Sequence, residues 1–257
     1  MTQRRCAIVT GAAQGLGRAI AERLLAVGIS VVGVDVQADK INALPAKLGP
    51  AAARFRAVAA ELSTEAGAAA PVEAALAAFG RLDILVNCAG GSGHTAVRYI
   101  DDLPPSLWDS VIGSNLDATY LCCRAAMPAL RKAEHGRIVN FSSSLATGST
   151  MWPSTVGARL AYCAAKGGIE AFSKQMALDL APAGITVNVI VPGFILTESG
   201  ARVRERFNML AEDDRTRLLG GRAPEQIATP DDIAEAAAYL VSERASHVNG
   251  AFLHVGT

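Results

Sequence analysis

The chain has 257 residues, of which 51% are hydrophobic and 19% charged, and its 24 basic and 24 acidic side chains give a formal net charge of zero. This length and apolar content can bury a large core, so one α/β domain is the best expectation, although length alone would allow two. The balanced charge provides no basic surface for nucleic acid or an anionic membrane.

The first predicted strand, residues 6–10, leads into a glycine turn and then an amphipathic helix that ends near Val27. The glycines follow the spacing G-x-x-x-G-x-G. Glycines without side chains let a pyrophosphate approach the N–H groups at a helix N-terminus. Taken alone this signal is weak. The residues expected to bind a cofactor here are Gly11, Gln14, Gly15, Leu16 and Gly17.

The second predicted strand, residues 30–34, ends at Asp35. A carboxylate in this place can accept hydrogen bonds from the adenosine ribose and would repel a 2′-phosphate. No basic residue follows before Lys40, so the expected cofactor is NAD rather than NADP. The alternative is an ordinary turn carboxylate, but its position after the glycine turn favours binding.

Further along, a helix is expected over residues 39–48, a strand over 54–58, and a helix from an N-cap at Ser63 to Phe79. The fourth strand, residues 84–86, ends in Asn87-Cys88-Ala89-Gly90, where small residues allow close approach of a ligand. We expect Asn87, Ala89 and Gly90 to contact the cofactor.

The next helix is expected from a cap at Ser106 to about Arg131, and it contains Asn115. This asparagine lies among apolar residues, so it should be buried and therefore hydrogen-bonded. Asn115 could join two segments of the chain by its hydrogen bonds, and it could also take part in catalysis.

The most informative stretch runs from Arg137 to Gly168. A short apolar strand ends in three serines, and a later helix carries Tyr162 and Lys166 four residues apart, on one face. A phenol with a pKa near 10 is a poor base at neutral pH. A nearby ammonium favours the phenolate, and lowering its pKa by ~3 units requires roughly 4 kcal/mol. The pair alone is common, at odds of roughly three to one against function.

The last third contains a strand over residues 186–191, the segment Pro192-Gly193-Phe194-Ile195-Leu196-Thr197, and a charged, weakly patterned stretch over 198–222. Thr229-Pro230 then begins a helix that runs to Val241, and residues 251–255 form the last strand. Because strands alternate with helices throughout, the sequence predicts an α/β fold: one domain with a doubly wound parallel sheet of the Rossmann type.

These motifs, in this order, resemble the short-chain dehydrogenase/reductase family over nearly the whole chain. The resemblance implies that Tyr162 exchanges the proton with the substrate oxygen and that Lys166 lowers its pKa and binds the nicotinamide ribose. Asn115 would support a proton-relay water, and Thr197 would contact the carboxamide. Further cofactor contacts implied are Glu61, Leu62, Pro192, Gly193 and Ile195.

The chain departs from the family pattern at a few positions. Cys88 stands where the family usually has Asn, and Glu61-Leu62 stands where Asp-Val is usual, which leaves the adenine contact of Glu61 less certain. The family serine matches Ser143 when counted from the strand, with Ser142 and Ser144 as alternatives.

The resulting hypothesis is an NAD-dependent enzyme that interconverts a secondary alcohol and a ketone, with Ser143 hydrogen-bonded to the developing alkoxide. A 3-oxoacyl-thioester reductase is the alternative within the same class, and a non-catalytic dinucleotide-binding regulator is the alternative from another class. The substrate is expected between residues 91–99, 145–159 and 194–222. Met151 and Trp152 in the second of these segments form either a pocket wall or a subunit contact, and both readings stay open.

Two sets of side chains near the expected substrate pocket could bind the substrate or could have no role in binding. His94 could reach the substrate or be an ordinary loop histidine. Arg202, Arg204 and Arg206 could attract an acidic substrate, but their interleaving with Glu198 and Glu205 is typical of a solvated helix face.

Cellular context follows from the apolar runs and the cysteines. The apolar runs are too short to span a bilayer, and the run after Arg4 and Arg5 is too short for a signal peptide. Five cysteines without paired spacing favour a reduced, cytoplasmic protein, and no His or Cys cluster has zinc-ligand spacing, so no metal is expected. The family resemblance implies a homotetramer, or less often a dimer.

Overall fold

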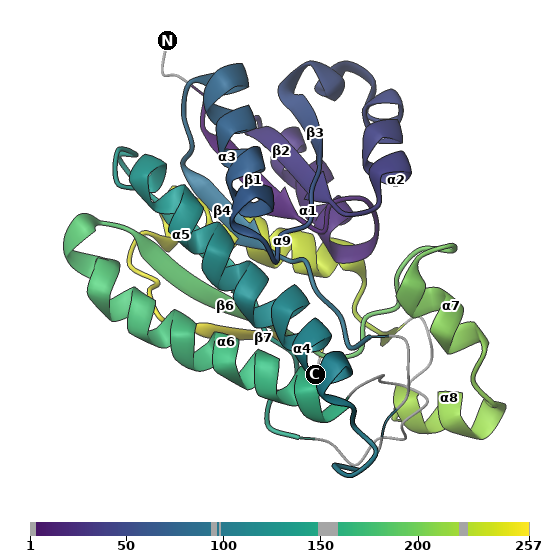
Figure 1. Cartoon of the computed structure of the whole chain (residues 1–257). Coiled ribbons are helices and arrows are strands. Elements are labelled where there is room, and N and C mark those ends of the chain that lie inside the picture. Colours follow the sequence, from purple (N-terminus) through teal and green to yellow (C-terminus); the bar gives the residue numbers. More distant parts are fainter. Residues whose placement is uncertain (1–3, 94–96, 98, 149–158, 221–225, 257) are drawn as a thin grey trace.

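The computed structural model describes residues 4–93, 97, 99–148, 159–220 and 226–256. Across these ranges, parallel strands form one seven-stranded sheet in the order β3-β2-β1-β4-β5-β6-β7 (Figure 1). The strands are β1 (Cys6–Thr10), β2 (Ser30–Asp35), β3 (Phe55–Ala59), β4 (Ile84–Asn87), β5 (Arg137–Phe141), β6 (Thr186–Pro192) and β7 (Phe252–Val255). The predicted doubly wound sheet is confirmed.

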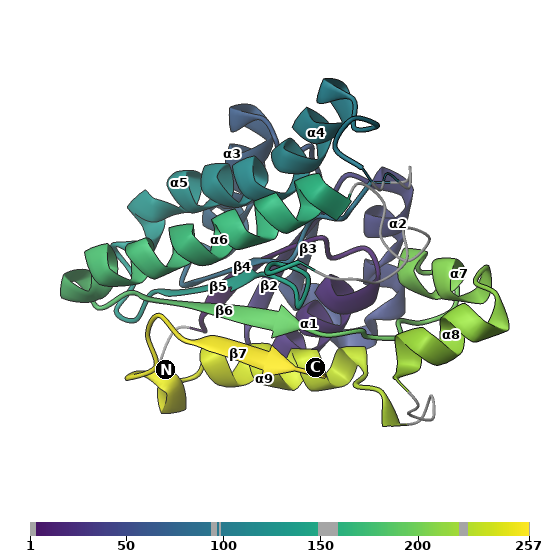
Figure 2. The ribbon, with the colours of Figure 1, turned by 90° about the horizontal axis from the view of Figure 1, so that it is seen from below.

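Helices cover both faces of this sheet, as the view in Figure 2 shows. One face carries α1 and α9, and the other carries α3, α5 and α6. The helices are α1 (Gly15–Ala26), α2 (Ala38–Ala43), α3 (Glu65–Phe79), α4 (Pro105–Ile112), α5 (Ala118–Leu130), α6 (Arg159–Leu180), α7 (Arg202–Asn208), α8 (Glu212–Leu219) and α9 (Pro230–Leu240). No helix in the described ranges is long and apolar enough to cross a bilayer.

The core lies in two apolar layers because the central strands are buried on both faces. Along β1, Ala7 and Val9 pack toward α1 and α9, whereas Cys6 and Ile8 pack toward α3, α5 and α6. A parallel sheet covered on both sides needs such continuous apolar strands rather than alternating ones. This explains why the short apolar runs of the sequence predict the strands well.

Two expected helix starts were wrong. The N-cap of α3 is Thr64, whose hydroxyl accepts from the N–H of Gly67, while the Ser63 hydroxyl donates to Glu61. The expected helix from Ser106 instead begins at Pro105, where a proline at the first position needs no side-chain cap. The expected N-cap at Thr229 is confirmed, with its reciprocal bonds to Asp232.

The strand order reverses between β1 and β4, and the loops after these two strands meet there. The N–H of Ala89 donates to the Thr10 hydroxyl at 2.9 Å. Gly11 has φ +69°, and a Cβ on it would lie 3.0 Å from the Ala89 Cα. Such a reversal leaves a crevice at the carboxyl ends of the strands, where open α/β sheets bind ligands.

Gly17 sets the close approach of α1 to the end of β1, and it provides the first prediction. A Cβ on Gly17 would lie 2.2 Å from the Gly11 carbonyl oxygen, so Gly17→Ala must shift main chain. We expect a loss of roughly 1–3 kcal/mol in the free energy of unfolding, measured by urea denaturation. The control is Gly113→Ala, whose Cβ would meet nothing closer than 3.9 Å and which should be neutral or slightly stabilising. An equal loss in both variants would contradict this account.

Candidate active site

The side chains expected to act on the substrate lie where β5 meets α6. The Lys166 ammonium donates to the main-chain carbonyl of Phe141, the last residue of β5, at 2.8 Å. The Ser142 hydroxyl lies 2.6 Å from the Glu170 carboxylate on α6. These contacts hold the first half of α6 against the strand end from which Ser143 follows. Ser143 itself is half-buried, and its Oγ accepts from the N–H of Leu145.

Lys166 is almost fully buried, with 4% of its surface exposed. Burial disfavours the charged form and lowers the pKa of Lys166 from its ordinary value to about 8, while Cys88 acts weakly in the opposite direction. Its Nζ lies 5.6 Å from the centre of the Tyr162 ring. The structure therefore places a poorly solvated cation beside the phenol, as the four-residue spacing predicts.

Tyr162 is half-buried on the face of α6 that packs against α4. Leu103, Leu107 and Val111 surround it with Ala161. Apolar packing of this kind restricts the orientation of the Tyr162 ring.

Asn115 is completely buried in a π-helical turn, Gly113–Asp117, between α4 and α5. Its amide donates to the carbonyls of Gly91 and Val111, and its Oδ1 accepts from the N–H of Gly91. The expectation that it is buried and hydrogen-bonded is confirmed. These bonds tie the loop after β4 to the helix; π turns often occur at functional sites.

The N-terminus of α1 begins at Gly15, which has φ +58°. Thr197 lies beside it, 4% exposed, and its buried Oγ1 has no hydrogen-bond partner within the described part of the chain. A Cβ on Gly15 would lie 3.4 Å from the Thr197 methyl carbon. A buried hydroxyl without a partner beside a helix N-terminus is a place where a ligand could be bound.

Glu198 enters this arrangement from the next position along the chain. The N–H of Gly15 donates to Glu198 Oε1 at 2.8 Å. Sequence reasoning missed this contact, because Glu198 was read only as the start of a charged stretch. Its position directly after the Pro192–Thr197 segment was the available signal.

Asp35 is the last residue of β2, as expected from the sequence, and 7% of its surface is exposed. One oxygen accepts from the N–H of Ala13 and the other from the N–H of Gln37. The oxygen bonded to Gln37 also accepts from the Gln37 side-chain amide at 3.4 Å, so the oxygen bonded to Ala13 keeps the remaining acceptor capacity. Lys40 donates to Gln14 at 3.0 Å, so one ammonium does lie near the glycine turn.

The remaining expected cofactor residues lie at the same edge, but Glu61 is occupied locally. Its carboxylate accepts from both the N–H and the hydroxyl of Ser63. Leu62 is buried, and Asn87 donates to Asn140 at 2.9 Å. The parallel strands bring to this one edge Gly11, Gln14, Gly15, Leu16, Gly17, Asp35, Glu61, Leu62, Asn87, Ala89, Gly90, Pro192, Gly193, Ile195 and Thr197.

The five cysteines are free thiols that act as small apolar groups. Burial raises the pKa of Cys6, Cys88 and Cys122 to about 12. Burial also raises the pKa of Cys123 and Cys163 above the ordinary value. Cys88 therefore stands as a neutral thiol where the family usually has asparagine. The described residues contain no cluster of three His, Cys, Asp or Glu that could hold a metal.

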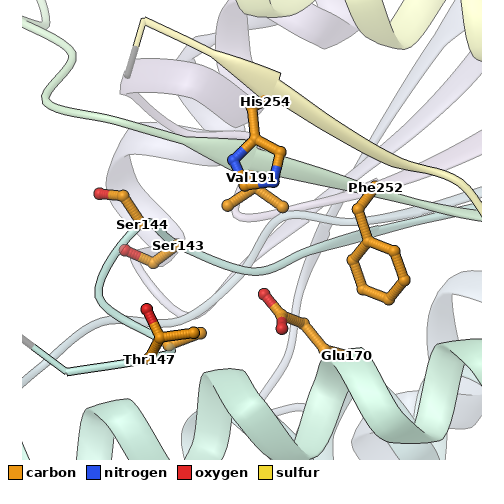
Figure 3. A pocket seen from close by; sticks show the side chains of 8 residues that line it. Ser143, Ser144, Thr147, Glu170, Val191, Phe252 and His254 are labelled. Atoms are coloured by element: carbon orange, nitrogen blue, oxygen red, sulfur yellow. The ribbon is translucent and has the colours of Figure 1, made fainter.

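A cavity of about 230 Å³ lies between the turn after β5, helix α6 and β7 (Figure 3). The Glu170 carboxylate points into it from α6, opposite His254 of β7. Ser143 lines this cavity, but Tyr162 and Lys166 do not. Of the candidate catalytic residues, the cavity therefore adjoins Ser143. Its lining residues are Ser143, Ser144, Ala146, Thr147, Glu170, Val191, Phe252 and His254.

The substrate segments are described in part. His94, Met151 and Trp152 lie outside the described residues. The interpretation of the arginine row as a solvated face was wrong for two members. Arg204 donates to the Thr197 carbonyl at 2.8 Å, and Arg206 donates to Ser92 at 3.2 Å and to the Gly93 carbonyl. Helix α7 is thus tied to two neighbouring loops.

Known proteins resemble this chain over nearly its whole length. Residues 5–208 match the family model described as short chain dehydrogenase. D-threitol dehydrogenase of Mycolicibacterium smegmatis is 36% identical, over 97% of this chain and 90% of that protein. 3-Oxoacyl-[acyl-carrier-protein] reductase FabG of Escherichia coli is 34% identical, over 98% and 95%. The crystal structure of 3-ketoacyl-(acyl-carrier-protein) reductase from Brucella melitensis complexed with NADH has a TM-score of 0.80 at 32% identity, covering 98% and 96%.

The buried ammonium of Lys166 gives the second prediction. Because its folded pKa of about 8 lies below the ordinary 10.5, the unfolded state binds more protons between these values. The cost of burying the charge is full below pH 8 and declines as pH rises toward 10.5. Relative to Lys166→Met, the wild type should therefore gain roughly 2 kcal/mol of stability from pH 7.5 to pH 10. Urea unfolding at several pH values measures this difference, and parallel curves for the two proteins would contradict it.

Proposed function

Because this chain belongs to the short-chain dehydrogenase family, we propose that it is an NAD-dependent enzyme interconverting a secondary alcohol and a ketone. As a family member it is an oxidoreductase that acts on CH–OH or keto groups with a nicotinamide cofactor. The observation that carries the proposal is Lys166, buried at the end of β5 with its ammonium beside the Tyr162 ring.

Each catalytic side chain has one role in this proposal. Tyr162 exchanges the proton with the substrate oxygen, and Lys166 favours its phenolate form. Ser143 donates a hydrogen bond to the oxygen on which negative charge develops. Asn115 holds the loop after β4 in place and supports the water molecule that relays the proton. The nicotinamide, when bound, supplies the hydride chemistry.

The residues around α1 and β2 support NAD over NADP as the cofactor. Gly15 and Thr197 would hold the diphosphate and the carboxamide, and Asp35 would accept from the ribose hydroxyls. Asp35 would face the 2′-phosphate of NADP at close range and repel it. The nearest cation along the chain is Lys40, and its ammonium already donates to the Gln14 side chain. The NADH complex named for the Brucella melitensis reductase supports the same assignment.

A 3-oxoacyl-thioester reductase is the second candidate, and two of the three relatives named above favour it. The Escherichia coli and Brucella melitensis proteins carry names for this reaction, at identities of 34% and 32%. D-threitol dehydrogenase, at 36%, favours a small hydroxylated substrate instead. Turnover measured side by side on an acetoacetyl thioester and on a panel of small ketones and polyols separates the two.

The surroundings of the site complete the proposal. Residues 91–99, 145–159 and 194–222 would enclose a small-molecule substrate, with Met151 and Trp152 as a pocket wall or a subunit contact. We also propose a homotetramer and a cytoplasmic location; the family supports the former, and five free thiols support the latter. The balanced charge supports neither nucleic acid nor membrane as a partner.

Replacing Tyr162 by Phe removes the group that exchanges the proton. Turnover of Tyr162→Phe should fall at least ~10²–10⁴-fold, the usual contribution of general acid–base catalysis, while NADH binding is kept. Steady-state rates and NADH fluorescence titration measure the two properties. Tyr239→Phe, at an exposed position of α9, is the matched control. Near-normal turnover in Tyr162→Phe would show that another group carries the proton.

Replacing Asp35 tests the cofactor. The wild type should have the higher kcat/KM with NADH, since like charges inside a site cost several kcal/mol. Asp35→Ala should narrow the ratio of NADH to NADPH kcat/KM by about tenfold or more. Asp39→Ala removes an exposed carboxylate one turn away and should leave the ratio unchanged. A wild type that prefers NADPH would overturn the assignment.

A further inference from the structure

Glu198 holds the position that a diphosphate needs at the N-terminus of α1. Its Oε1 accepts the N–H of Gly15 at 2.8 Å, so a carboxylate lies on the first residue of a 12-residue helix. The partial positive charge of a helix N-terminus stabilises an anion there. In the protein without cofactor, the anion at this helix end is supplied by the chain itself.

A second observation shows that this location is built for a ligand. Thr197, adjacent to Glu198, is 4% exposed, and its Oγ1 lacks a hydrogen-bond partner among the described residues. The Thr197 methyl carbon would contact a Cβ on Gly15 at 3.4 Å, so the Thr197 side chain packs beside the helix end. A buried hydroxyl without a partner is costly unless something else binds it.

We propose that Glu198 is an internal competitor of the dinucleotide: its carboxylate caps Gly15 in the free protein and is displaced when the diphosphate binds. The inference rests on the proposed use of NAD at this site. The diphosphate and the carboxylate both carry negative charge and need the same N–H group. They therefore exclude each other, and each binding event must first break the Glu198 contact.

The displacement is structurally feasible because other bonds hold the main chain around Glu198. Arg204 donates to the carbonyl of Thr197, and the N–H of Ala201 donates to the carbonyl of Glu198 itself. Phe207 of α7 packs against Phe194 with ring centres 5.7 Å apart. The Glu198 side chain can thus rotate away while α7 keeps its anchors. The exchange costs a hydrogen bond and leaves the fold intact.

The experiment compares Glu198→Ala and Glu198→Gln with the wild type, by NADH fluorescence titration and by calorimetry with ADP-ribose and adenosine. Glu198→Ala should bind NADH and ADP-ribose about 3- to 10-fold more tightly, the effect of one hydrogen bond of ordinary net strength. Glu198→Gln keeps an acceptor without charge and should show part of this gain. Adenosine has no phosphate, so its affinity should not change.

Two controls separate local competition from a general effect of charge. Glu212→Gln removes an exposed carboxylate from the same segment and should leave the NADH affinity unchanged. In the protein without cofactor, amide hydrogen exchange at Gly15 should be faster in Glu198→Ala than in the wild type. Thermal unfolding of each variant near the wild-type temperature confirms that the fold is kept.

The outcomes distinguish this inference from the proposed function. Unchanged NADH affinity in both Glu198 variants, or an equal gain for adenosine, would overturn the role of Glu198 while leaving the enzyme assignment in place. A wild type that binds neither NADH nor ADP-ribose would overturn both.

Discussion

The hydrogen bond from the Lys166 ammonium to the Phe141 carbonyl joins the last residue of β5 to the second turn of α6. A buried charge is tolerated only where its donors are satisfied, so this bond fixes how helix and strand meet. Ser143 lies two residues beyond the strand, and Tyr162 lies one turn before the lysine. The positions of the hydroxyl, the phenol and the cation therefore all follow from one contact. The same burial that lowers the lysine pKa also makes the cation effective on its neighbour, because little water screens it.

Most of the fold could be predicted because its signals are local. The strands are continuous apolar runs, and the expected ligand residues lie at or after strand ends, as Asp35 ends β2 and Asn87 ends β4. Once all strands are parallel, their carboxyl ends must share an edge. Asn115 could be predicted as buried from its apolar neighbours alone. The ordered set of motifs then indicated the family, which no single motif could do.

What could not be predicted depends on side chains meeting backbone groups far away in the chain. Glu198 and Gly15 are 183 positions apart in the chain, and Arg206 and Ser92 are 114 apart. Hydrophobic periodicity describes one helix or strand at a time, so it could predict neither contact. The predicted start of α3 was wrong by one residue. Ser63 and Thr64 are both good N-cap residues, and the three-dimensional structure shows that the Thr64 hydroxyl accepts from the N–H of Gly67. The alternation of charges over residues 198–222 suggested a solvated face, whereas part of it is tied to the neighbouring loops.

The buried thiols have a consequence for how the protein responds to oxidants. Peroxide and alkylating reagents attack the thiolate, and a thiol with a pKa of about 12 is ionised in roughly one molecule in 10⁵ at pH 7. Cys88, close to the cofactor crevice, is as unreactive in this sense as Cys6 and Cys122 in the core. At position 88, where the family usually has asparagine, this chain therefore has a thiol that is not readily ionised or oxidised. A loss of activity on oxidation or alkylation is therefore not expected to begin at Cys6, Cys88 or Cys122.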